Sequence, residues 1–237
     1  MPSKCSTLYE VKTPNMKRDR WVTFDCFGTL IDWLNGFRAI LAPIAGDRTE
    51  ALMRAYDDAE RTLEAEQPHH LYRFVLTTGL VRAAQVAGVN LASADADLLA
   101  RRWGSQPLFP DVPKGLDKLR ADGWKIGVLT NCDDNLFAET LARHPDLAPD
   151  LVITAEQVGS YKPKLGHFER FEVLSGVIRE NWIHAANSWF HDIEPAQRYG
   201  IKRIWVDRDR TGHDPTTASC VIGAVGDLPA ALAKLVG

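Results

Sequence analysis

The sequence predicts an α/β fold, namely a Rossmann-like, doubly wound parallel sheet core with an inserted helical cap domain. Nearly continuous apolar runs recur along the chain, and helical patterns lie between most of them. Parallel strands that are covered on both faces have such runs, and alternation of strands with helices is typical of doubly wound sheets. One long interval after the first run breaks this rhythm, because it has helical spacing and no convincing strand.

The apolar runs give the predicted strands in order. They are residues 21–24, 125–130, 151–154, 182–187, 203–207 and 220–225. The predicted helices between or after them are residues 112–122, 133–144, 164–178, 190–199 and 228–236. We read residues 1–20, which are polar and carry several basic side chains, as an N-terminal extension.

The interval without strands is predicted to form the cap. Residues 48–66 have the spacing of a charged amphipathic helix, residues 71–87 of a more apolar one, and residues 93–103 of a third that Ser93 would cap. We therefore assign residues 34–106 to the cap and residues 21–33 and 107–237 to the core. Ligands of open α/β sheets bind at the carboxyl ends of the strands, so an insert after the first strand is a candidate lid.

Composition excludes several classes of function. The chain has 237 residues, of which 45% are hydrophobic and 25% charged, with a formal net charge of -3. This balance gives no reason to expect a nucleic-acid partner, and no apolar run is long enough to span a membrane. The cysteines, Cys5, Cys26, Cys132 and Cys220, form no C-x-x-C pair, which favours reduced thiols in a cytoplasmic protein. The expected partner is a small molecule.

Four polar motifs follow successive predicted strands. Asp25 stands in FDCFGTL, Thr130 and Asn131 in VLTNCDD, Lys162 in GSYKPKLGHF, and Asn187, Ser188 and Asp192 in AANSWFHDIEP. Alone, each motif is as well explained by a turn, a helix cap or a solvated loop. Together they are predicted to meet at one edge of the sheet, because the carboxyl ends of parallel strands lie there.

This ordered set resembles the haloacid dehalogenase superfamily of hydrolases, from near Trp21 to near Arg208. The resemblance implies that Asp25 is the nucleophile, and Thr29 completes the Asp-x-x-Gly-Thr signature of the first motif. It further implies that Thr130 is the hydroxyl of the second motif and that Lys162 holds the nucleophile. The helical insert matches the cap that these enzymes place after the first motif, and relatives often pair as homodimers.

Two departures from the superfamily pattern indicate a particular branch. Phosphatases of the superfamily carry an aspartate two residues after the nucleophile, which protonates the leaving alkoxide, whereas this chain has Phe27. The acidic fourth motif that binds Mg²⁺ in phosphatases is replaced by Asn187. The sequence looks like the (S)-2-haloacid dehalogenases, which implies no metal and no cofactor. In that chemistry Asp25 displaces halide to form an ester, and Asp192 is the candidate for activating the water that hydrolyses it.

The resemblance also suggests which residues bind substrate. Backbone N–H groups after Asp25, at Cys26 and Phe27, and the Thr130 hydroxyl would hold the carboxylate. Asn131 and a cap arginine would receive the halide; Arg54 is the candidate, with Arg38 or Arg73 as alternatives. Residues Asn187, Ser188 and Trp189 replace the usual serine-serine-asparagine order. The aromatic residues Phe27, Trp33, Phe37 and Trp189 form either an apolar slot or, by default for Trp33 and Phe37, core.

Other functions remain open from the sequence. The same ester chemistry serves azetidine-2-carboxylate hydrolase, where the leaving nitrogen needs a proton that His191, Tyr56 or Asp58 would supply. A Mg²⁺-dependent phosphatase and a non-catalytic binder that kept the fold are further alternatives.

Overall fold

The fold is built on one sheet of parallel strands. The computed structural model describes residues 19–236. Its strands are β1 (Arg20–Phe24), β2 (Trp124–Thr130), β3 (Leu151–Thr154), β4 (Trp182–Ala186), β5 (Lys202–Val206) and β6 (Cys220–Ile222). They lie in the order β3-β2-β1-β4-β5-β6, and every pair is parallel. The chain thus winds outward from β1 in one direction and then returns to β4, so β1 sits at the topological switch point.

Alternate residues of each strand enter the hydrophobic layers on opposite faces of the sheet. On β1, Val22 and Phe24 belong to the larger core cluster, whereas Trp21 belongs to a second cluster with Phe171 and Trp182. Both faces of β1 are buried, which is why its sequence is an uninterrupted apolar run. The resulting architecture is the predicted doubly wound α/β fold.

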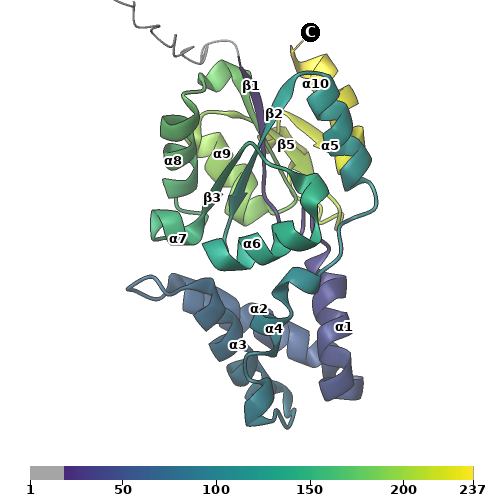
Figure 1. Cartoon of the computed structure of the whole chain (residues 1–237), viewed down its shortest axis with the longest axis vertical. Helices are drawn as coiled ribbons and strands as arrows, with labels where there is room; N and C mark the ends of the chain where they lie inside the picture. Colours follow the sequence, from purple (N-terminus) through teal and green to yellow (C-terminus); the bar gives the residue numbers. More distant parts are fainter. Residues whose placement is uncertain (1–18, 237) are drawn as a thin grey trace, which may run out of the picture.

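Helices cover the two faces. Helices α8 and α9 lie on one side of the sheet and α5 and α10 on the other, with α6 near the carboxyl ends of the strands (Figure 1). Their bounds are α5 (Val112–Ala121), α6 (Asp134–Arg143), α7 (Ala155–Val158), α8 (Gly166–Ser175), α9 (Glu194–Tyr199) and α10 (Leu228–Val236).

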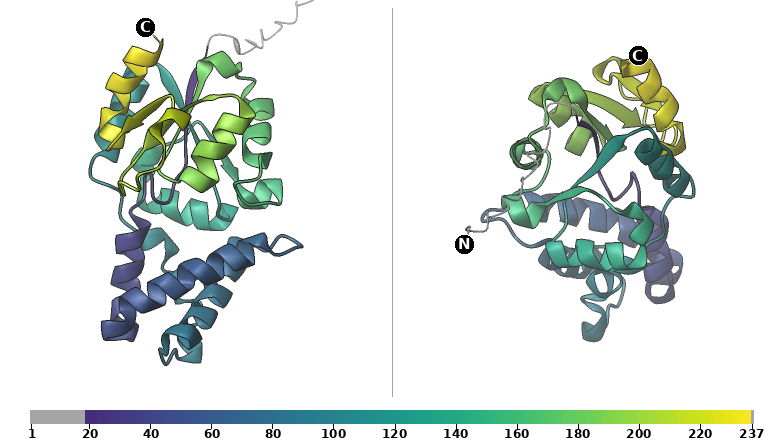
Figure 2. Two further views of the ribbon diagram at one scale, coloured as in Figure 1. Left: turned by 180° about the vertical axis from the view of Figure 1, so that it is seen from behind. Right: turned by 45° about the horizontal axis from the view of Figure 1, so that its top comes forward.

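The remaining helices gather beyond the carboxyl ends of the strands. They are α1 (Trp33–Ala45), α2 (Thr49–Ala65), α3 (Tyr72–Ala87) and α4 (Leu98–Arg101), and they form a separate layer in Figure 1 and in the left view of Figure 2. Helix α1, near the start of the predicted cap, is not among the helices predicted from the sequence. The assignment of residues 34–106 to a separate domain stays a prediction, although these helices lie where a lid would.

Several predicted elements differ in detail. The predicted helix at 93–103 is broken into a 3₁₀ turn (Ser93–Asp95), α4 and a second 3₁₀ turn (Trp103–Ser105). Ser93 makes no side-chain cap, because the residue before the turn, Ala92, occupies the cap position. The last strand ends at Ile222, three residues before its predicted end. The predicted extension overlaps β1 at Arg20, and its residues 1–18, with Cys5, lie outside the described residues.

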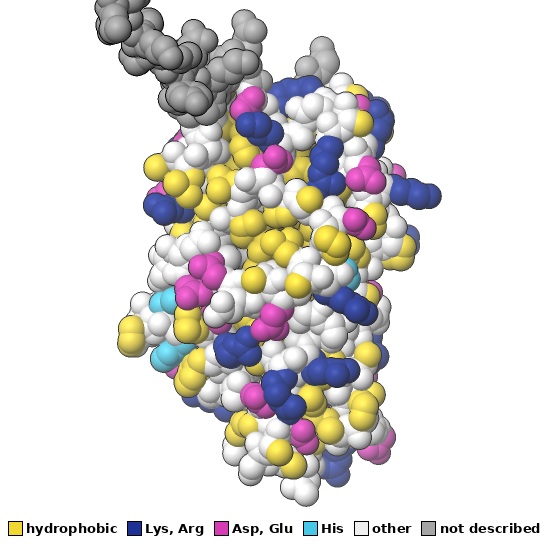
Figure 3. Space-filling model, viewed as in Figure 1, with side chains coloured by type: hydrophobic (Ala, Val, Ile, Leu, Met, Phe, Trp, Pro, Cys, Tyr) yellow, Lys and Arg dark blue, Asp and Glu magenta, His cyan; other side chains and the backbone are white. Residues whose placement is uncertain are grey.

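The surface carries scattered charges of both signs, with no continuous basic face in the view of Figure 3. Within residues 19–236, none of the helices combines the length and apolar character needed to cross a bilayer.

Candidate active site

The first motif forms a tight turn directly after β1. The carbonyl of Cys26 accepts hydrogen bonds from the N–H groups of Thr29, Leu30 and Ile31, at 3.3, 2.8 and 2.9 Å. Gly28 has a φ of +99°, a conformation that side-chain-bearing residues rarely adopt. This turn leaves the Asp25 carboxylate at the carboxyl edge of the sheet, where it lines a cavity.

Both carboxylate oxygens of Asp25 are held. Thr29 Oγ1 donates to Asp25 Oδ2 at 2.9 Å, and Lys162 Nζ donates to Oδ1 at 2.8 Å. The backbone N–H of Asn187 in turn donates to Thr29 Oγ1 at 2.9 Å, which directs the hydroxyl hydrogen toward Asp25. A nucleophilic carboxylate needs such fixed orientation, because an attacking oxygen must be aligned with the bond that it breaks.

Lys162 joins two motifs through one ammonium group. Its Nζ donates to Asp25, to Asp192 Oδ1 at 2.7 Å and to the Leu129 carbonyl at 2.9 Å, so all three of its hydrogens have acceptors. The side chain is only 1% exposed. Burial lowers the pKa of Lys162, but the two carboxylates outweigh burial and hold the pKa above its usual value. The lysine therefore carries its charge.

The two carboxylates are not equivalent. Burial raises the pKa of Asp25, and the charge of Asp192 raises it further, against the opposing effects of Lys162 and Thr29. Burial also raises the pKa of Asp192, but Lys162 and His184 together hold that pKa below the usual value. Asp192 is thus the more firmly ionised of the pair.

Asp192 lines the same cavity and is fully buried. It belongs to a π-helical turn, η6 (Trp189–Ile193), and such turns are frequent at functional sites. Its Oδ1 accepts from both Lys162 and His184, whereas its buried Oδ2 has no hydrogen-bond partner among residues 19–236. An unpartnered buried oxygen that belongs to a cavity-lining residue is suited to receive a proton from a bound water.

A buried chain of hydrogen bonds supports Asp192 from the sheet. Trp182 Nε1 donates to Thr23 Oγ1 at 2.8 Å, Thr23 Oγ1 lies 2.9 Å from His184 Nδ1, and His184 Nε2 lies 2.9 Å from Asp192 Oδ1. A neutral His184 with its hydrogen on Nε2 satisfies every step, since Thr23 accepts from Trp182 and donates to Nδ1. The register of β1 and β4, which pairs Thr23 with His184, places these side chains together.

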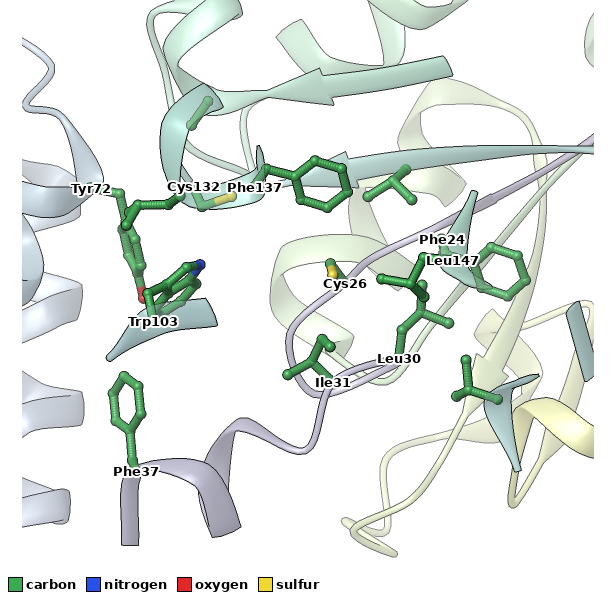
Figure 4. Close-up of a cluster of buried hydrophobic side chains, with 14 of the residues drawn as sticks. Phe24, Cys26, Leu30, Ile31, Phe37, Tyr72, Trp103, Cys132, Phe137 and Leu147 are labelled. Atoms are coloured by element: carbon green, nitrogen blue, oxygen red, sulfur yellow. The ribbon is translucent and has the colours of Figure 1, made fainter. Parts of the chain in front are cut away.

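The cavity above Asp25 has a volume of about 540 Å³ and is bounded by the core and by the cap helices. Aromatic rings form much of its apolar wall. The rings of Phe27 and Trp103 lie 4.2 Å apart, and Trp103 stands between Tyr72 and Phe37 (Figure 4). Trp33 and Trp189 also line the cavity. All four predicted aromatic residues thus line the cavity, while Phe37 is also a buried core residue and Trp33 packs against the same core. Their role as a slot for the substrate stays a prediction.

Several predicted substrate contacts lie at this cavity. Phe27, Thr130 and Asn131 line it. Asn131 clamps the backbone of Lys162, because its Oδ1 accepts from the Lys162 N–H at 2.8 Å and its Nδ2 donates to the Lys162 carbonyl at 3.2 Å. Asn131 therefore positions the lysine, and its role toward a leaving group stays a prediction.

The fourth-motif residues line the cavity with their polar groups already engaged. The amide of Asn187 donates to Asp209 Oδ2 at 2.7 Å and accepts from the Arg208 N–H at 3.1 Å. Ser188 Oγ lies 3.1 Å from His191 Nδ1. Trp189 stacks on His213 with ring centroids 4.7 Å apart. Their predicted contacts to substrate remain predictions.

Two predicted substrate residues are not at the cavity. Arg54 is exposed on α2, one helical turn before Asp57, the first residue of that helix at the cavity, and it lies near Glu50. Arg38 and Arg73, the alternatives, form ion pairs with Glu50 and Glu139. The side chain of Cys26 is fully buried in the core and does not line the cavity, although its backbone stays a candidate. Cys132 is likewise buried.

The structure adds residues that the sequence had not indicated. Arg61, Glu60 and Glu64 of α2, Tyr72 of α3 and Trp103 line the cavity, and His184 supports Asp192 from within β4. The amphipathic pattern of residues 48–66 was a usable signal, because these α2 residues share one face at helical spacing. Nothing in the sequence separates the cavity end of that face from its solvent end.

Comparison with known proteins places the chain in a family. A family model described as haloacid dehalogenase-like hydrolase matches residues 20–200. A phosphoserine phosphatase of Thermus thermophilus is 28% identical over 138 residues, which span 56% of this chain and 53% of the phosphatase.

Solved structures agree with this placement at the level of the fold. The crystal structure of a dehalogenase has a TM-score of 0.81 at 19% identity, covering 91% of this chain and 98% of that one. The L-2-haloacid dehalogenase of Xanthobacter autotrophicus has a TM-score of 0.80 at 18% identity, covering 92% and 100%. Given the match over most of its length, the chain belongs to the haloacid dehalogenase-like hydrolase family.

Proposed function

We propose that this hydrolase converts small (S)-2-haloalkanoic acids to 2-hydroxy acids with inversion at C2, through an ester of Asp25. The observation that carries the proposal is the environment of Asp25. Its carboxylate is fixed by Lys162 and Thr29, and the residue two positions on is Phe27, whose ring lines the cavity. Such a site supplies a nucleophile without an adjacent general acid, which suits a leaving group that departs as a stable anion.

The proposed reaction has two steps. An oxygen of Asp25 attacks C2 from the side opposite the halogen, the carbon–halogen bond breaks, and halide leaves with the bonding electron pair. A water then attacks the carboxyl carbon of Asp25 and gives a proton to Asp192. The ester bond breaks, Asp192 passes its proton to the departing oxygen, and the 2-hydroxy acid is released. Asp25 is left as a carboxylic acid and loses the second water proton to solvent, which restores the carboxylate. The unpartnered Oδ2 of Asp192 supports its role as the base.

The decisive test is a single turnover of (S)-2-chloropropionate in H₂¹⁸O with enzyme in excess. The proposal expects ¹⁸O in the peptide that contains Asp25, because water attacks the carboxyl carbon. Label found in the 2-hydroxy acid after one turnover, with none in Asp25, would exclude the ester route.

Two other functions are weighed by particular observations. The likeness to a phosphoserine phosphatase supports Mg²⁺-dependent phosphatase activity, which predicts turnover of p-nitrophenyl phosphate that EDTA abolishes. EDTA-insensitive chloride release favours the dehalogenase. Azetidine-2-carboxylate hydrolysis requires a proton donor at the cavity: His191 lines it, whereas Asp58 is exposed and the Tyr56 hydroxyl is bound to Glu60.

A further inference from the structure

The part of the cavity wall that α2 forms has acidic side chains with no role in the proposed chemistry. Asp57, Glu60 and Glu64 share the face of α2 that lines the cavity, and Arg61 is the basic residue among them. Arg61 is already paired, since its Nη2 lies 2.8 Å from Asp57 Oδ2, and its side chain is 70% exposed. Glu60 and Glu64, one helical turn apart, are therefore the carboxyl groups to explain.

Glu60 is held as a hydrogen-bond acceptor. The hydroxyl groups of Tyr56 and Tyr72 both donate to Glu60 Oε1, the former at 3.2 Å. Both phenols use the same oxygen, which leaves Oε2 for another donor. Burial raises the pKa of Glu60 to about 7, although the tyrosine hydrogen bonds lower it. A donor with a positive charge would favour its ionised form.

Glu64 lies where the cap meets the core. Its side chain is 12% exposed, and its Oε2 is 3.8 Å from His191 Nε2. Burial lowers the pKa of His191 to about 4, so this histidine is neutral near pH 7 and does not balance the carboxylate. Burial and the nearby Glu60 raise the pKa of Glu64 well above its usual value, while Lys162 and a hydrogen bond from Asn131 oppose them.

The charges of the cavity do not suit a simple anion. Among the described residues that line it, the lysine and arginine are Lys162, which serves Asp25 and Asp192, and Arg61, which serves Asp57. A plain haloacid brings one more negative charge to a wall with two carboxyl groups that have no basic partner. A substrate with an ammonium group beside its carboxylate supplies a positive charge that stabilises the ionised form of these groups, which burial otherwise disfavours.

We propose that the preferred substrates are small 2-substituted acids that also carry a protonated amine, with Glu60 and Glu64 receiving the ammonium group. This proposal rests on the ester chemistry of Asp25 proposed above. It accounts for two partly buried carboxyl groups on one helix face and for the engagement of the cavity's basic side chains by acids.

The test compares two substrates that differ only in charge. (S)-3-Amino-2-chloropropanoate has an ammonium group where (S)-2-chlorobutanoate has a methyl group, and both release chloride by the same step. We expect the wild-type kcat/KM to be at least about tenfold higher for the amino-substituted substrate than for 2-chlorobutanoate, equivalent to about 1.4 kcal/mol. Glu60→Gln and Glu64→Gln should lose most of this preference and still turn over 2-chlorobutanoate, which also shows that they fold.

The matched control is Glu50→Gln, which alters an exposed glutamate of the same helix that pairs with Arg38. This variant should keep the preference for the amino-substituted substrate. If the wild type prefers 2-chlorobutanoate, or if Glu60→Gln and Glu64→Gln both keep the preference for the amino-substituted substrate, the proposal is overturned.

A binding measurement separates this proposal from the dehalogenase proposal. 3-Aminopropanoate and butanoate lack a leaving group, so calorimetry reports their binding whether or not the enzyme releases halide. Tighter binding of 3-aminopropanoate that Glu64→Gln abolishes supports the ammonium site even if neither chlorinated substrate reacts. Equal binding of the two acids, or tighter binding of butanoate, overturns it.

Discussion

At the scale of single residues, the site depends on one ammonium group shared by two buried carboxylates. Lys162 Nζ bonds Asp25 and Asp192 and is nearly inaccessible to solvent. Removing one partner of a buried ion pair is costly, because the remaining charges lose their compensation. The same contacts fix the nucleophile and one oxygen of the proposed base, so stability and reactivity depend on the same atoms.

Lys162→Met should abolish halide release and lower the free energy of unfolding by about 3–5 kcal/mol, because two carboxylates lose their counter-ion. Denaturant unfolding and chloride release measure the two effects, and exposed Lys164→Met serves as the control. Adding Asp25→Asn to Lys162→Met should restore part of the stability and none of the activity. A double variant no more stable than Lys162→Met would contradict this account.

His184 should act on the second step of the reaction through Asp192. His184→Leu removes one of the two donors to Asp192 Oδ1, so the carboxylate loses its fixed orientation. We expect ester hydrolysis to slow more than ester formation, so that mass spectrometry detects the Asp25 adduct after mixing with (S)-2-chloropropionate.

His184→Gln, which retains an N–H donor, should recover part of the hydrolysis rate. His144→Leu is the control, since the ring of His144 bonds the Gln106 carbonyl away from the cavity. If His184→Leu slows both steps equally and no adduct accumulates, the positioning role is wrong.

The raised pKa of Asp25 predicts how the rate of the first step falls on the acid side of its pH–rate profile. Only the carboxylate attacks C2, and burial together with Asp192 raises the pKa of Asp25 above its usual value. Single-turnover chloride release should therefore fall with decreasing pH around a pKa above that of an ordinary aspartate. In Asp192→Asn this fall in rate should occur at lower pH, because one negative charge near Asp25 is gone. If the fall stays at the same pH or moves to higher pH, Asp192 does not raise the pKa of Asp25.

At the scale of elements, α2 combines a structural face with a functional one. Leu52, Met53, Tyr56 and Leu63 pack into the core, while the neighbouring face lines the cavity. Partly buried Glu60 lies on the cavity face and is hydrogen bonded to Tyr56 and to Tyr72 of α3. The helix therefore carries a carboxyl group that destabilises the fold when it is ionised without a partner.

Glu60→Gln should stabilise the protein at pH 8, on the order of 1–3 kcal/mol. The folded pKa of about 7 lies above the ordinary value of 4.5, so the folded state binds the proton more tightly and loses stability as pH rises from 4.5 to 7. The groups that act on Glu60 are Tyr56, Asp57, Arg61 and Glu64 on α2 and Tyr72 on α3. Thermal unfolding should show the gain at pH 8 and little at pH 4.5. The same gain at both values would contradict it.

The strands, and the motifs that follow them, could be predicted because a strand that is buried on both faces has an uninterrupted apolar sequence. The helix at 93–103 could not, since Leu99 and Trp103 are apolar at helical spacing yet belong to separate short turns. The sequence indicated which face of α2 is apolar, but it did not indicate which turn of that helix lies at the cavity. The position of Arg54 relative to the cavity depends on packing between segments that are distant in sequence. His184 in β4 resembles any strand residue until the register brings Thr23 beside it.

At the scale of the whole molecule, the layer of α1 to α4 is joined to the sheet domain by contacts between residues far apart in sequence. The carboxylate of Asp133, just before α6, accepts the N–H groups of Tyr72 and Arg73 at the start of α3, at 2.6 and 2.8 Å. The Tyr161 hydroxyl donates to the His70 carbonyl at 2.7 Å. The two Asp133 bonds satisfy N–H groups that a helix start leaves without intrahelical partners.

Asp133→Ala should loosen the cap without unfolding the core. Loss of the two helix-capping hydrogen bonds is expected to lower the free energy of unfolding by about 1–2 kcal/mol. It should also raise the KM for substrate, because the cavity wall on α2 and α3 is less firmly held. Hydrogen exchange at Tyr72 and Arg73 should accelerate, while exchange in β1 and β4 stays slow. Asp117→Ala, an exposed control, should change neither. Unaltered exchange at the start of α3 would contradict this role.

The position of Asp133 ties the first turn of α3 to the segment before α6. If the layer of α1 to α4 moves away from the sheet, as the predicted lid would, the N–H groups of Tyr72 and Arg73 lose their acceptor. Opening of the cavity and fraying of that turn would then occur together, and closure would require the turn to re-form.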